Sequence, residues 1–465
     1  MYKVGLYTLG CKVSLYETEA ISESFAEAGF EISSFDDVCD VYVINTCTVT
    51  AESDAKSRKY IRRAIRKNPN AVVIVIGCYS QRSPDEVAAI KGVSAVLGTQ
   101  DKMKCVEIAD KLLNSDRRAP SAVSRQNRSI SNSDLTDATA LQELVQKSEC
   151  YVGSLDGAEF EPMCVKNAPR TRAYVKIEDG CECRCTYCAI SGARGPVRSK
   201  RPEDVISEVE GLYKSGTLEI VLTGIETGSY GADFDEKYDL ADLICELDER
   251  RSCERIRLGS MAPELLGEDF IEKISKTRIM VPHFHISMQS GSTNVLKNMK
   301  RRYNREMALK NIRRIKEKMP RVMLTADLMV GFPGESEQDF LDTVSFVHEA
   351  GLLDAHVFAY SKRDGTPAAE FADQIPEGVK RERSARLISE VAAVRDRVLD
   401  SVVASAEPLS CILESYKNGV YTSHSDSYIE VVCEGEIGFS GRLVSVKPLR
   451  HENGKIYGKI INIDN

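Results

Sequence analysis

Residues 180–188 read Gly-Cys-Glu-Cys-Arg-Cys-Thr-Tyr-Cys, which places Cys181, Cys185 and Cys188 in the spacing C-x3-C-x2-C. A structural zinc site closes with four protein ligands, whereas a cubane iron-sulfur cluster held by three cysteines keeps one iron open for another molecule. Cys183, which lies between these cysteines, leaves open a C-x-C-x2-C ligation or a four-thiolate site for zinc or a closed cluster. The three-cysteine spacing favours a reactive iron-sulfur site.

Strand-like runs alternate with helix-like stretches from residue 172 onward. There are six such runs, at Ala173–Ile177, Leu218–Thr223, Arg255–Leu258, His283–Gln289, Met323–Val330 and Ala355–Tyr360. Six consecutive strand-helix units predict a partial βα barrel, shorter than the eight-unit closed barrel. Reactive residues should gather at the C-terminal ends of its strands, and the cysteine loop follows the first of them.

One strand of this predicted barrel has a polar face. His283, His285, Ser287 and Gln289 alternate with apolar residues. A closed barrel fills its interior with branched apolar side chains, so a polar inward face indicates a ligand-bearing lumen. The histidines could equally be satisfied core residues, and Gln289, at the strand end, is the stronger candidate for a contact.

Three further cysteines each follow a predicted strand in the N-terminal part of the chain. The strands are Tyr2–Leu9, Val41–Asn45 and Ala71–Ile76, with helix-like segments between them, and the cysteines are Cys11, Cys47 and Cys78. In a parallel sheet the corresponding strand ends lie at one edge, where open α/β proteins place their ligands. A single cysteine here would be read as a packed apolar residue, but three in the same position predict a second cluster.

Two regions are candidates for contact with nucleic acid. The tail from about residue 409 reads as short strands and turns, which predict a small β-barrel with Arg442 and Lys447 near its basic end and Tyr428 and Tyr457 as possible stacking faces. The helix-like segment 56–67 repeats arginine at every fourth position, at Arg58, Arg62 and Arg66. A solvated surface is the usual reason for such a run, and a phosphate contact is the alternative.

Composition sets the broad class of the protein. The 465 residues are 42% hydrophobic, carry a formal net charge of -8 and include 15 cysteines. The charge speaks against a protein that coats nucleic acid by bulk attraction. An odd, high number of cysteines fits free thiols and metal ligands in a reducing compartment. With no apolar run near the roughly 20 residues of a spanning helix and no signal-peptide pattern, we expect a soluble cytoplasmic protein without a membrane partner.

These motifs together resemble the radical S-adenosylmethionine (SAM) methylthiotransferases over nearly the whole chain. The resemblance rests on Thr8 to Val13, Asn45 to Cys47, Gly77 to Tyr79, Gly180 to Cys188 and Ser290 to Ser292. It implies an N-terminal cluster domain (1–113), a linker (114–168), a central radical SAM (βα)6 barrel (169–403) and a C-terminal RNA-binding TRAM barrel (404–465). The chain is most similar to the subfamily that acts on threonylcarbamoyladenosine.

The resemblance also implies a site for each cofactor. Cys181, Cys185 and Cys188 would hold a 4Fe-4S cluster whose open iron binds SAM, and Cys11, Cys47 and Cys78 would hold a second 4Fe-4S cluster that presents sulfur. SAM contacts would come from positions near the strand ends and the cysteine loop, at Tyr187, Thr223, Gly224, Ser260, Gln289 and Arg302. The partners would be a tRNA, modified at an adenosine of its anticodon loop, a reducing electron donor and an unidentified sulfur donor.

Several alternatives stay open at this point. The substrate could be C2 of N6-threonylcarbamoyladenosine at tRNA position 37, an isopentenyladenosine in tRNA, or an aspartate of a ribosomal protein. A non-catalytic iron-sulfur electron carrier is a further possibility from another class. The chain departs from the family pattern at Ser14, where relatives usually have asparagine, and at Glu226, where the threonylcarbamoyladenosine subfamily often has histidine.

Overall fold

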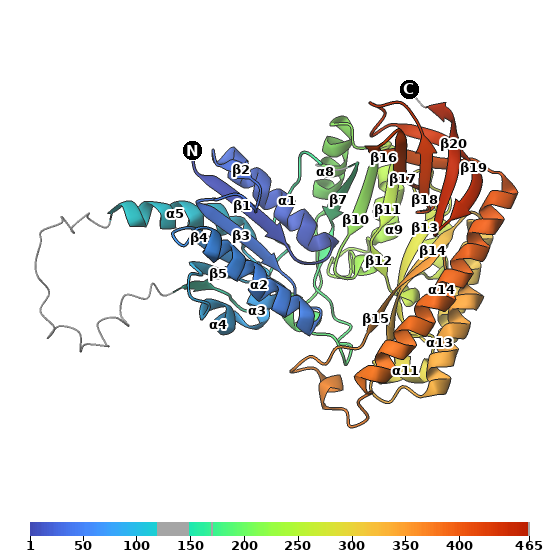
Figure 1. Ribbon diagram of the computed structural model, residues 1–465, viewed down its shortest axis with the longest axis horizontal. Helices are drawn as coiled ribbons and strands as arrows, with labels where there is room; N and C mark the ends of the chain where they lie inside the picture. The colour runs from blue at the N-terminus through green and yellow to red at the C-terminus, as the bar shows by residue number, and fades with distance from the viewer. Residues whose placement is uncertain (119–147, 169–170, 464–465) are drawn as a thin grey trace, which may run out of the picture. The chain divides into compact units, whose positions relative to one another are not determined.

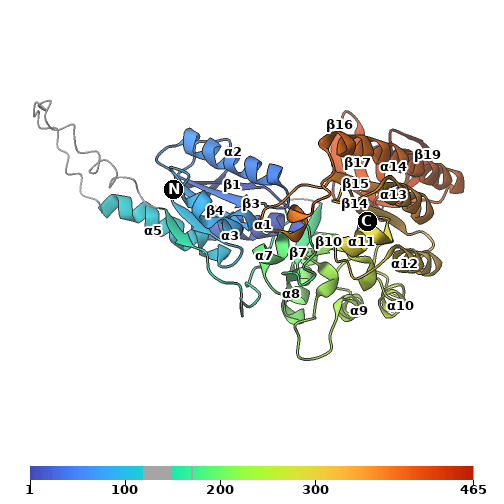
Figure 2. The same ribbon diagram turned by 90° about the horizontal axis from the view of Figure 1, so that it is seen from below.

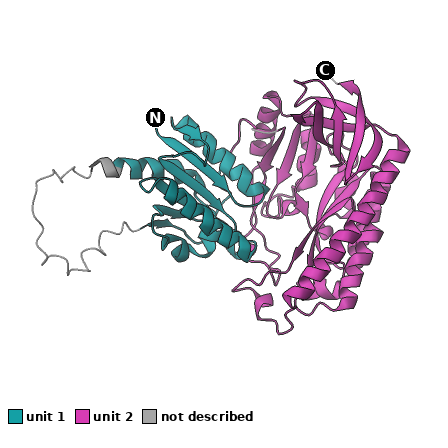
Figure 3. Cartoon of the chain, in the orientation of Figure 1, with its two compact units in different colours: residues 1–163, 192–194 teal, residues 164–191, 195–465 magenta. Residues whose placement is uncertain are grey.

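The computed structural model describes residues 1–118, 148–168 and 171–463 (Figure 1). These residues divide into two compact units, which are residues 1–163 with 192–194, and residues 164–191 with 195–465 (Figure 3). Most of the segment predicted to be a linker, residues 119–147, lies outside the described residues. None of the described helices combines the length and the apolar character needed to cross a membrane.

The N-terminal unit is built on a parallel sheet. Its described strands pair in the order β2-β1-β3-β4-β5-β6, with the bounds Glu31–Ser33, Lys3–Thr8, Val41–Thr46, Val72–Gly77, Ala95–Leu97 and Glu149–Tyr151. All residues of β3 and β4 are buried, as expected for central strands that are covered on both faces. The final strand, β6, lies in the segment predicted to be a linker. It was not predicted because three residues are too few to show the alternation of a strand.

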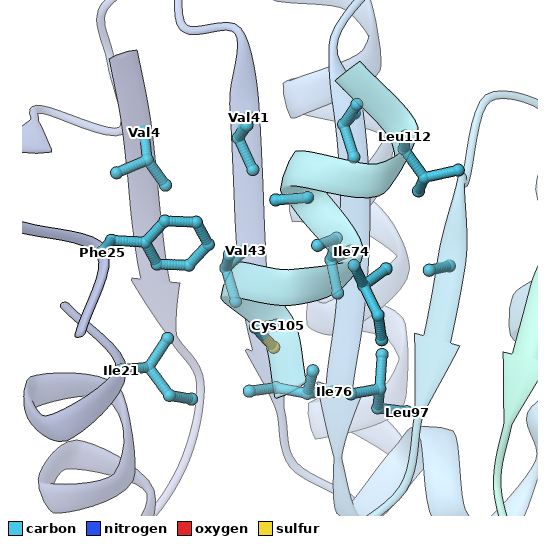
Figure 4. Packing of buried hydrophobic residues seen from close by; sticks show 14 residues of the cluster. Val4, Ile21, Phe25, Val41, Val43, Ile74, Ile76, Leu97, Cys105 and Leu112 are labelled. Atoms are coloured by element: carbon cyan, nitrogen blue, oxygen red, sulfur yellow. The ribbon is translucent and has the colours of Figure 1, made fainter. Parts of the chain in front are cut away.

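Helices cover both faces of this sheet. Residues of α1 (Lys12–Glu27) and α5 (Cys105–Arg118) pack on one face against Val4, Val43 and Ile74 (Figure 4). The opposite face carries residues of α2 (Ala51–Lys67) and α4 (Pro84–Ala88). The short helix α3 (Cys78–Arg82) follows β4 directly. This arrangement confirms the predicted N-terminal parallel α/β fold.

The second unit contains the predicted partial barrel. Its parallel strands are β7 (Arg172–Lys176), β10 (Glu219–Thr223), β11 (Arg255–Leu258), β12 (Ser260–Met261), β13 (His283–Gln289), β14 (Met323–Val330) and β15 (Asp354–Ala359). One sheet has the order β11-β10-β7 and the other β12-β13-β14-β15, and Gly259 alone separates β11 from β12. The strands therefore follow chain order around an open barrel, as predicted. The two-residue strand β12 is additional to the six predicted strands.

Helices follow these strands around the outside, as Figure 2 shows. They are α8 (Pro202–Lys214), α9 (Leu240–Arg250), α10 (Glu268–Ile274), α11 (Thr293–Asn298), α12 (Arg305–Lys318), α13 (Glu337–Ala350) and α14 (Glu377–Ser405). The short strands β8 (Glu178–Asp179) and β9 (Arg198–Ser199) pair with each other on either side of the cysteine loop and α7 (Ile190–Arg194). The pairing closes the base of that loop.

The C-terminal strands form a closed barrel in the order β16-β17-β18-β20-β19, which confirms the predicted fold of the tail. Their bounds are Leu409–Lys417, Val420–Ser425, Glu430–Glu434, Lys455–Ile463 and Leu443–Glu452. Asn418 and Gly419 form the hairpin between β16 and β17, with φ angles of 53° and 84°. Tyr428 precedes β18 and has a φ of 69°.

Tyr428 does not offer a free stacking face, contrary to the prediction for it. Its ring stacks on His283 with centroids 4.6 Å apart and on His424 at 4.9 Å, and the Arg257 guanidinium lies 5.0 Å from its centroid. His283 and Arg257 belong to the open barrel of parallel strands, whereas Tyr428 and His424 belong to the C-terminal barrel. The side chain therefore joins the two barrels of this unit.

We expect Tyr428→Ala to lower the free energy of unfolding of this unit by about 2 kcal/mol, because two ring stacks and a cation-π contact are lost. The matched control is Tyr457→Ala. The Tyr457 ring on β20 also meets an arginine, with the Arg450 guanidinium 4.0 Å from its centroid, but Arg450 lies on the neighbouring strand β19 of the same barrel. Urea-induced unfolding measures both. Equal losses for the two variants would contradict this role for Tyr428.

Candidate active site

The structure brings the three N-terminal cysteines to one edge of the sheet. Strands β1, β3 and β4 are neighbours, and Cys11, Cys47 and Cys78 follow their C-terminal ends. Burial raises the pKa of Cys78 to about 11, and the neighbouring Cys11 and Cys47 raise it further, while Arg194 acts in the opposite direction. These mutual effects place the three thiols within electrostatic range of one another.

Glycine backbone geometry fixes the ends of two of these strands. Gly77 has a φ of 100°, and a Cβ there would lie 2.6 Å from both Asn45 Oδ1 and the Thr46 carbonyl oxygen. A Cβ on Gly10 would lie 2.8 Å from Ser14 Oγ. Gly77 needs glycine because a side chain would strain the backbone and push against the strand end that carries Cys47, whereas at Gly10 the Ser14 hydroxyl would have to move.

The chemistry of both thiol sets matches the ligands of a cubane cluster. Such a cluster is held by cysteine thiolates, each bonded to a different iron. Cys11, Cys47 and Cys78 follow neighbouring strands of one sheet, and Cys181, Cys185 and Cys188 lie on one loop. Among the described residues, no group of three or more His, Cys, Asp or Glu side chains is arranged to hold one metal ion.

The central cysteine loop lies between β8 and β9, beyond the C-terminal end of β7. Gly180 begins it with a φ of 98°, and a Cβ there would come within 1.8 Å of the Pro196 carbonyl oxygen. The Cys181 amide donates to the Gly195 carbonyl oxygen at 3.0 Å, and the Thr186 amide donates to Met299 at 3.1 Å. The loop is thus held at both ends and in its middle.

Arg301 is a site residue that the sequence interpretation missed. Its Nη1 donates to Cys185 Sγ at 3.2 Å and its Nη2 to the Ser287 carbonyl oxygen at 2.9 Å. The predicted SAM contact, Arg302, is exposed and donates to the Glu182 carbonyl oxygen at 3.3 Å. Two adjacent arginines carry no periodic signal that distinguishes the half-buried Arg301 from the exposed Arg302.

The other predicted SAM-contacting residues have different surroundings. Tyr187 packs edge-to-face on Phe332 at 6.4 Å. Thr223 and Gln289 end β10 and β13, Gly224 follows β10, and Ser260 begins β12. These strand ends belong to one barrel, and Tyr187 belongs to the cysteine loop that follows its first strand.

Both histidines on the polar face of β13 contact the neighbouring strand β14. His283 Nε2 and His285 Nδ1 lie 3.0 Å and 2.8 Å from Thr325 Oγ1. His285 Nε2 also lies 3.2 Å from Asp327 Oδ2. Gln289 is not part of this network and has a φ of 65°, which a glutamine rarely adopts.

The structure places the predicted RNA-contacting residues on two surfaces. In α2, Arg58 pairs with Glu86 at 3.0 Å, whereas Arg62 and Arg66 line a hollow of about 520 Å³ together with Lys91. In the C-terminal barrel Arg442 and Lys447 are exposed. Lys447 lies opposite Lys459, which adds a second positive charge to that surface.

The comparisons with known proteins agree with this arrangement. The radical SAM superfamily matches residues 175–347, and the uncharacterized protein family UPF0004 matches residues 3–98. A relative from Bacillus subtilis, named threonylcarbamoyladenosine tRNA methylthiotransferase MtaB, is 41% identical over 97% of this chain and 94% of its own. The chain belongs to the radical SAM tRNA methylthiotransferase family. The family implies SAM and a 4Fe-4S cluster as cofactors.

Two further similarities bear on substrate and fold. A Clostridium perfringens protein named tRNA-2-methylthio-N(6)-dimethylallyladenosine synthase is 29% identical over 98% of this chain and 96% of its own. The solved structure of the radical SAM methyltransferase TsrM from Kitasatospora setae matches with a TM-score of 0.55 at 16% identity, covering 79% of this chain and 75% of that one. The latter similarity confirms the fold alone.

Cys183 and Cys181 interact directly, so the ligand set of the loop needs a test. Their hydrogen bond lowers the pKa of Cys183 to about 6 and raises that of Cys181. We expect Cys183→Ala to retain the iron content of the wild-type protein, and Cys181→Ala to lose one cluster. Iron analysis after anaerobic reconstitution measures this, and equal losses in the two variants would reverse the ligand assignment.

Proposed function

We propose that the chain transfers a methylthio group to C2 of N6-threonylcarbamoyladenosine at position 37 of tRNA. The observation that carries this proposal is the end-to-end alignment with the Bacillus subtilis relative of that name, in a chain that has cysteines at both cofactor sites. A tRNA substrate would place the enzyme in the cytoplasm. An isopentenylated adenosine is the second candidate, supported by the Clostridium perfringens relative.

We assign one set of three cysteines to each cofactor. Cys181, Cys185 and Cys188 would hold the SAM-binding 4Fe-4S cluster. Residues Cys11, Cys47 and Cys78 would hold a second 4Fe-4S cluster that presents the sulfur. When bound, the first cluster would supply the electron that cleaves one SAM, and the second cluster would supply the sulfur atom. A second SAM would supply the methyl group, and an external reductant and a sulfur donor would be required.

The residues around the central loop have roles that follow from their positions. Arg301 would steady Cys185 through its hydrogen bond to Sγ, and the bond to Ser287 would fix the guanidinium. Tyr187, Thr223, Gly224, Ser260, Gln289 and Arg302 would orient SAM. Because the predicted reactive centre lies at strand ends within a barrel, its walls would exclude water from a reactive radical.

Two basic surfaces would bind the RNA. Neither Arg62 nor Arg66 lies within ion-pair distance of an acidic group among the described residues, so both could meet phosphates. Arg58 is held by Glu86 and by the Tyr79 hydroxyl at 2.9 Å, which makes it the weakest member of its row. Arg442 and Lys447 would supply the contact from the C-terminal barrel.

The salt dependence of tRNA binding tests the α2 surface. Replacing both Arg62 and Arg66 by alanine should weaken binding and reduce the slope of log K against log salt by about 2, because each phosphate contact contributes about one unit. The matched control is Arg63→Ala, since Arg63 is already paired with Asp36 on the same helix. A slope unchanged in the double variant would remove α2 from the interface.

Analysis of modified nucleosides tests the reaction itself. Reconstituted protein is incubated anaerobically with SAM, a reductant and tRNA that carries either threonylcarbamoyladenosine or isopentenyladenosine, and the digested nucleosides are analysed by mass. We expect a gain of one methylthio group on the first tRNA, lost in the Cys11→Ala and Cys181→Ala variants.

Each other outcome identifies an alternative. A gain on the isopentenylated tRNA alone would replace the proposed substrate. Deoxyadenosine is the product of reductive SAM cleavage. Its release without modification of either tRNA would redirect the search to a ribosomal-protein aspartate. Absence of SAM cleavage with both clusters in place would favour an electron carrier.

A further inference from the structure

Three charged side chains without solvent exposure lie together behind the N-terminal cysteine edge. They are Glu17 of α1, Lys102 and Arg194. Lys102 Nζ lies 2.8 Å from Glu17 Oε1, and Arg194 Nη1 lies 2.6 Å from the same oxygen. Burying charges costs free energy even when they are paired, and here two cations share one carboxylate, so this cluster needs a reason beyond packing.

Arg194 makes a specific contact with a predicted cluster ligand. Its Nε donates to Cys78 Sγ at 3.1 Å, while Nη1 and Nη2 both point at the Glu17 carboxylate, at 2.6 Å and 3.4 Å. The two-point contact with Glu17 fixes the plane of the guanidinium. The third donor is therefore held toward the sulfur, a direction that a flexible lysine would not maintain.

The same carboxylate leads to the other two cysteine-bearing strand ends. Asn45, two residues before Cys47, donates from Nδ2 to Glu17 Oε2 at 3.4 Å and to the Ser14 carbonyl oxygen at 3.1 Å. Ser14 Oγ lies 3.8 Å from Cys11 Sγ. One network of hydrogen bonds thus reaches the thiols of Cys78 and Cys11 and includes Asn45, two residues before Cys47. Within this network the charged donor to a sulfur is Arg194.

Arg194 comes from a distant part of the sequence. It lies six residues after Cys188, yet Gly192 to Arg194 belong to the N-terminal unit. This segment is anchored there by a second bond, because Thr99 Oγ1 donates to the Ala193 carbonyl oxygen at 2.7 Å. Thr99 in turn accepts from Lys102 through its carbonyl oxygen at 2.6 Å. The guanidinium is therefore placed by both its backbone and its side chain.

We propose that Arg194 is a positioning residue of the second cluster, which holds Cys78 in place and makes the cluster easier to reduce. A hydrogen bond from a cation to a ligand sulfur stabilises the added negative charge of the reduced state, and such bonds are a known control of cluster potential. The inference rests on the proposed second cluster, and it adds a residue from outside the N-terminal domain to that site.

The test uses full-length protein in which Cys181, Cys185 and Cys188 are replaced by alanine, so that only the second cluster can assemble. Into this background we introduce Arg194→Lys, which keeps the charge and loses the fork, and Arg194→Gln, which loses the charge. The matched control is Arg198→Lys, because Arg198 is also buried, lies four residues further on and pairs with Asp179 at 3.7 Å.

Iron content, a dithionite titration followed by electron paramagnetic resonance, and thermal unfolding of the iron-free protein are then measured. We expect both Arg194 variants to shift the reduction potential to a more negative value, with the larger shift in Arg194→Gln, and the control to leave it unchanged. Loss of iron from variants whose iron-free form unfolds normally would also support the proposal, since Cys78 would then be misplaced.

Two results would overturn the inference alone. One is an unchanged potential at full iron content in both variants. The other is unfolding of both iron-free Arg194 variants while the control stays folded, which would show that the side chain only maintains the fold. A background protein without any iron would instead contradict the second cluster itself, and the inference with it.

Discussion

Parallel pairing of β1, β3 and β4 is the constraint on which the N-terminal site depends. Thr46 of β3 is paired with Gly77 of β4, so Cys47 and Cys78 each follow the paired position by one residue. Thr8 of β1 is paired with Asn45, and Cys11 follows after a short turn. A shift in register between any two strands would separate the thiols. The close backbone approach at Gly77 and the hydrogen bond from the Asn45 side chain to the Ser14 carbonyl oxygen hold these strand ends in register.

The second unit gathers its thiols by a different route. All of its candidate ligands lie on one loop, so their spacing is set by local backbone rather than by sheet register. Gly180 and the pairing of β8 with β9 close the base of the loop, and Arg301 reaches Cys185 from a later segment. The two sites nonetheless share one feature, because in each an arginine from elsewhere in the sequence, buried in the case of Arg194 and half-buried in the case of Arg301, donates to a cysteine sulfur.

Short sequence patterns predicted the strands and the cysteines that follow them, but not the contacts between residues far apart in the sequence. The apolar runs of β3 and β4 and the cysteine after each were visible, because central strands are buried on both faces. Arg194 and Arg301 were not, since their roles arise from contacts 116 residues apart in sequence in both cases. The interpretation of Tyr428 was wrong for the same reason, because two of its partners, His283 and Arg257, lie in another barrel.

Glu226 shows how a departure from the family pattern can retain a chemical property. The carboxyl group is buried at the end of β10, where its Oε1 accepts from the Ala262 amide at 3.1 Å. Burial raises the pKa of Glu226 to about 8, so it holds its proton at neutral pH. A protonated carboxyl can both accept and donate a hydrogen bond, as a neutral histidine can. Glutamate at this position is therefore chemically compatible with the proposed threonylcarbamoyladenosine substrate.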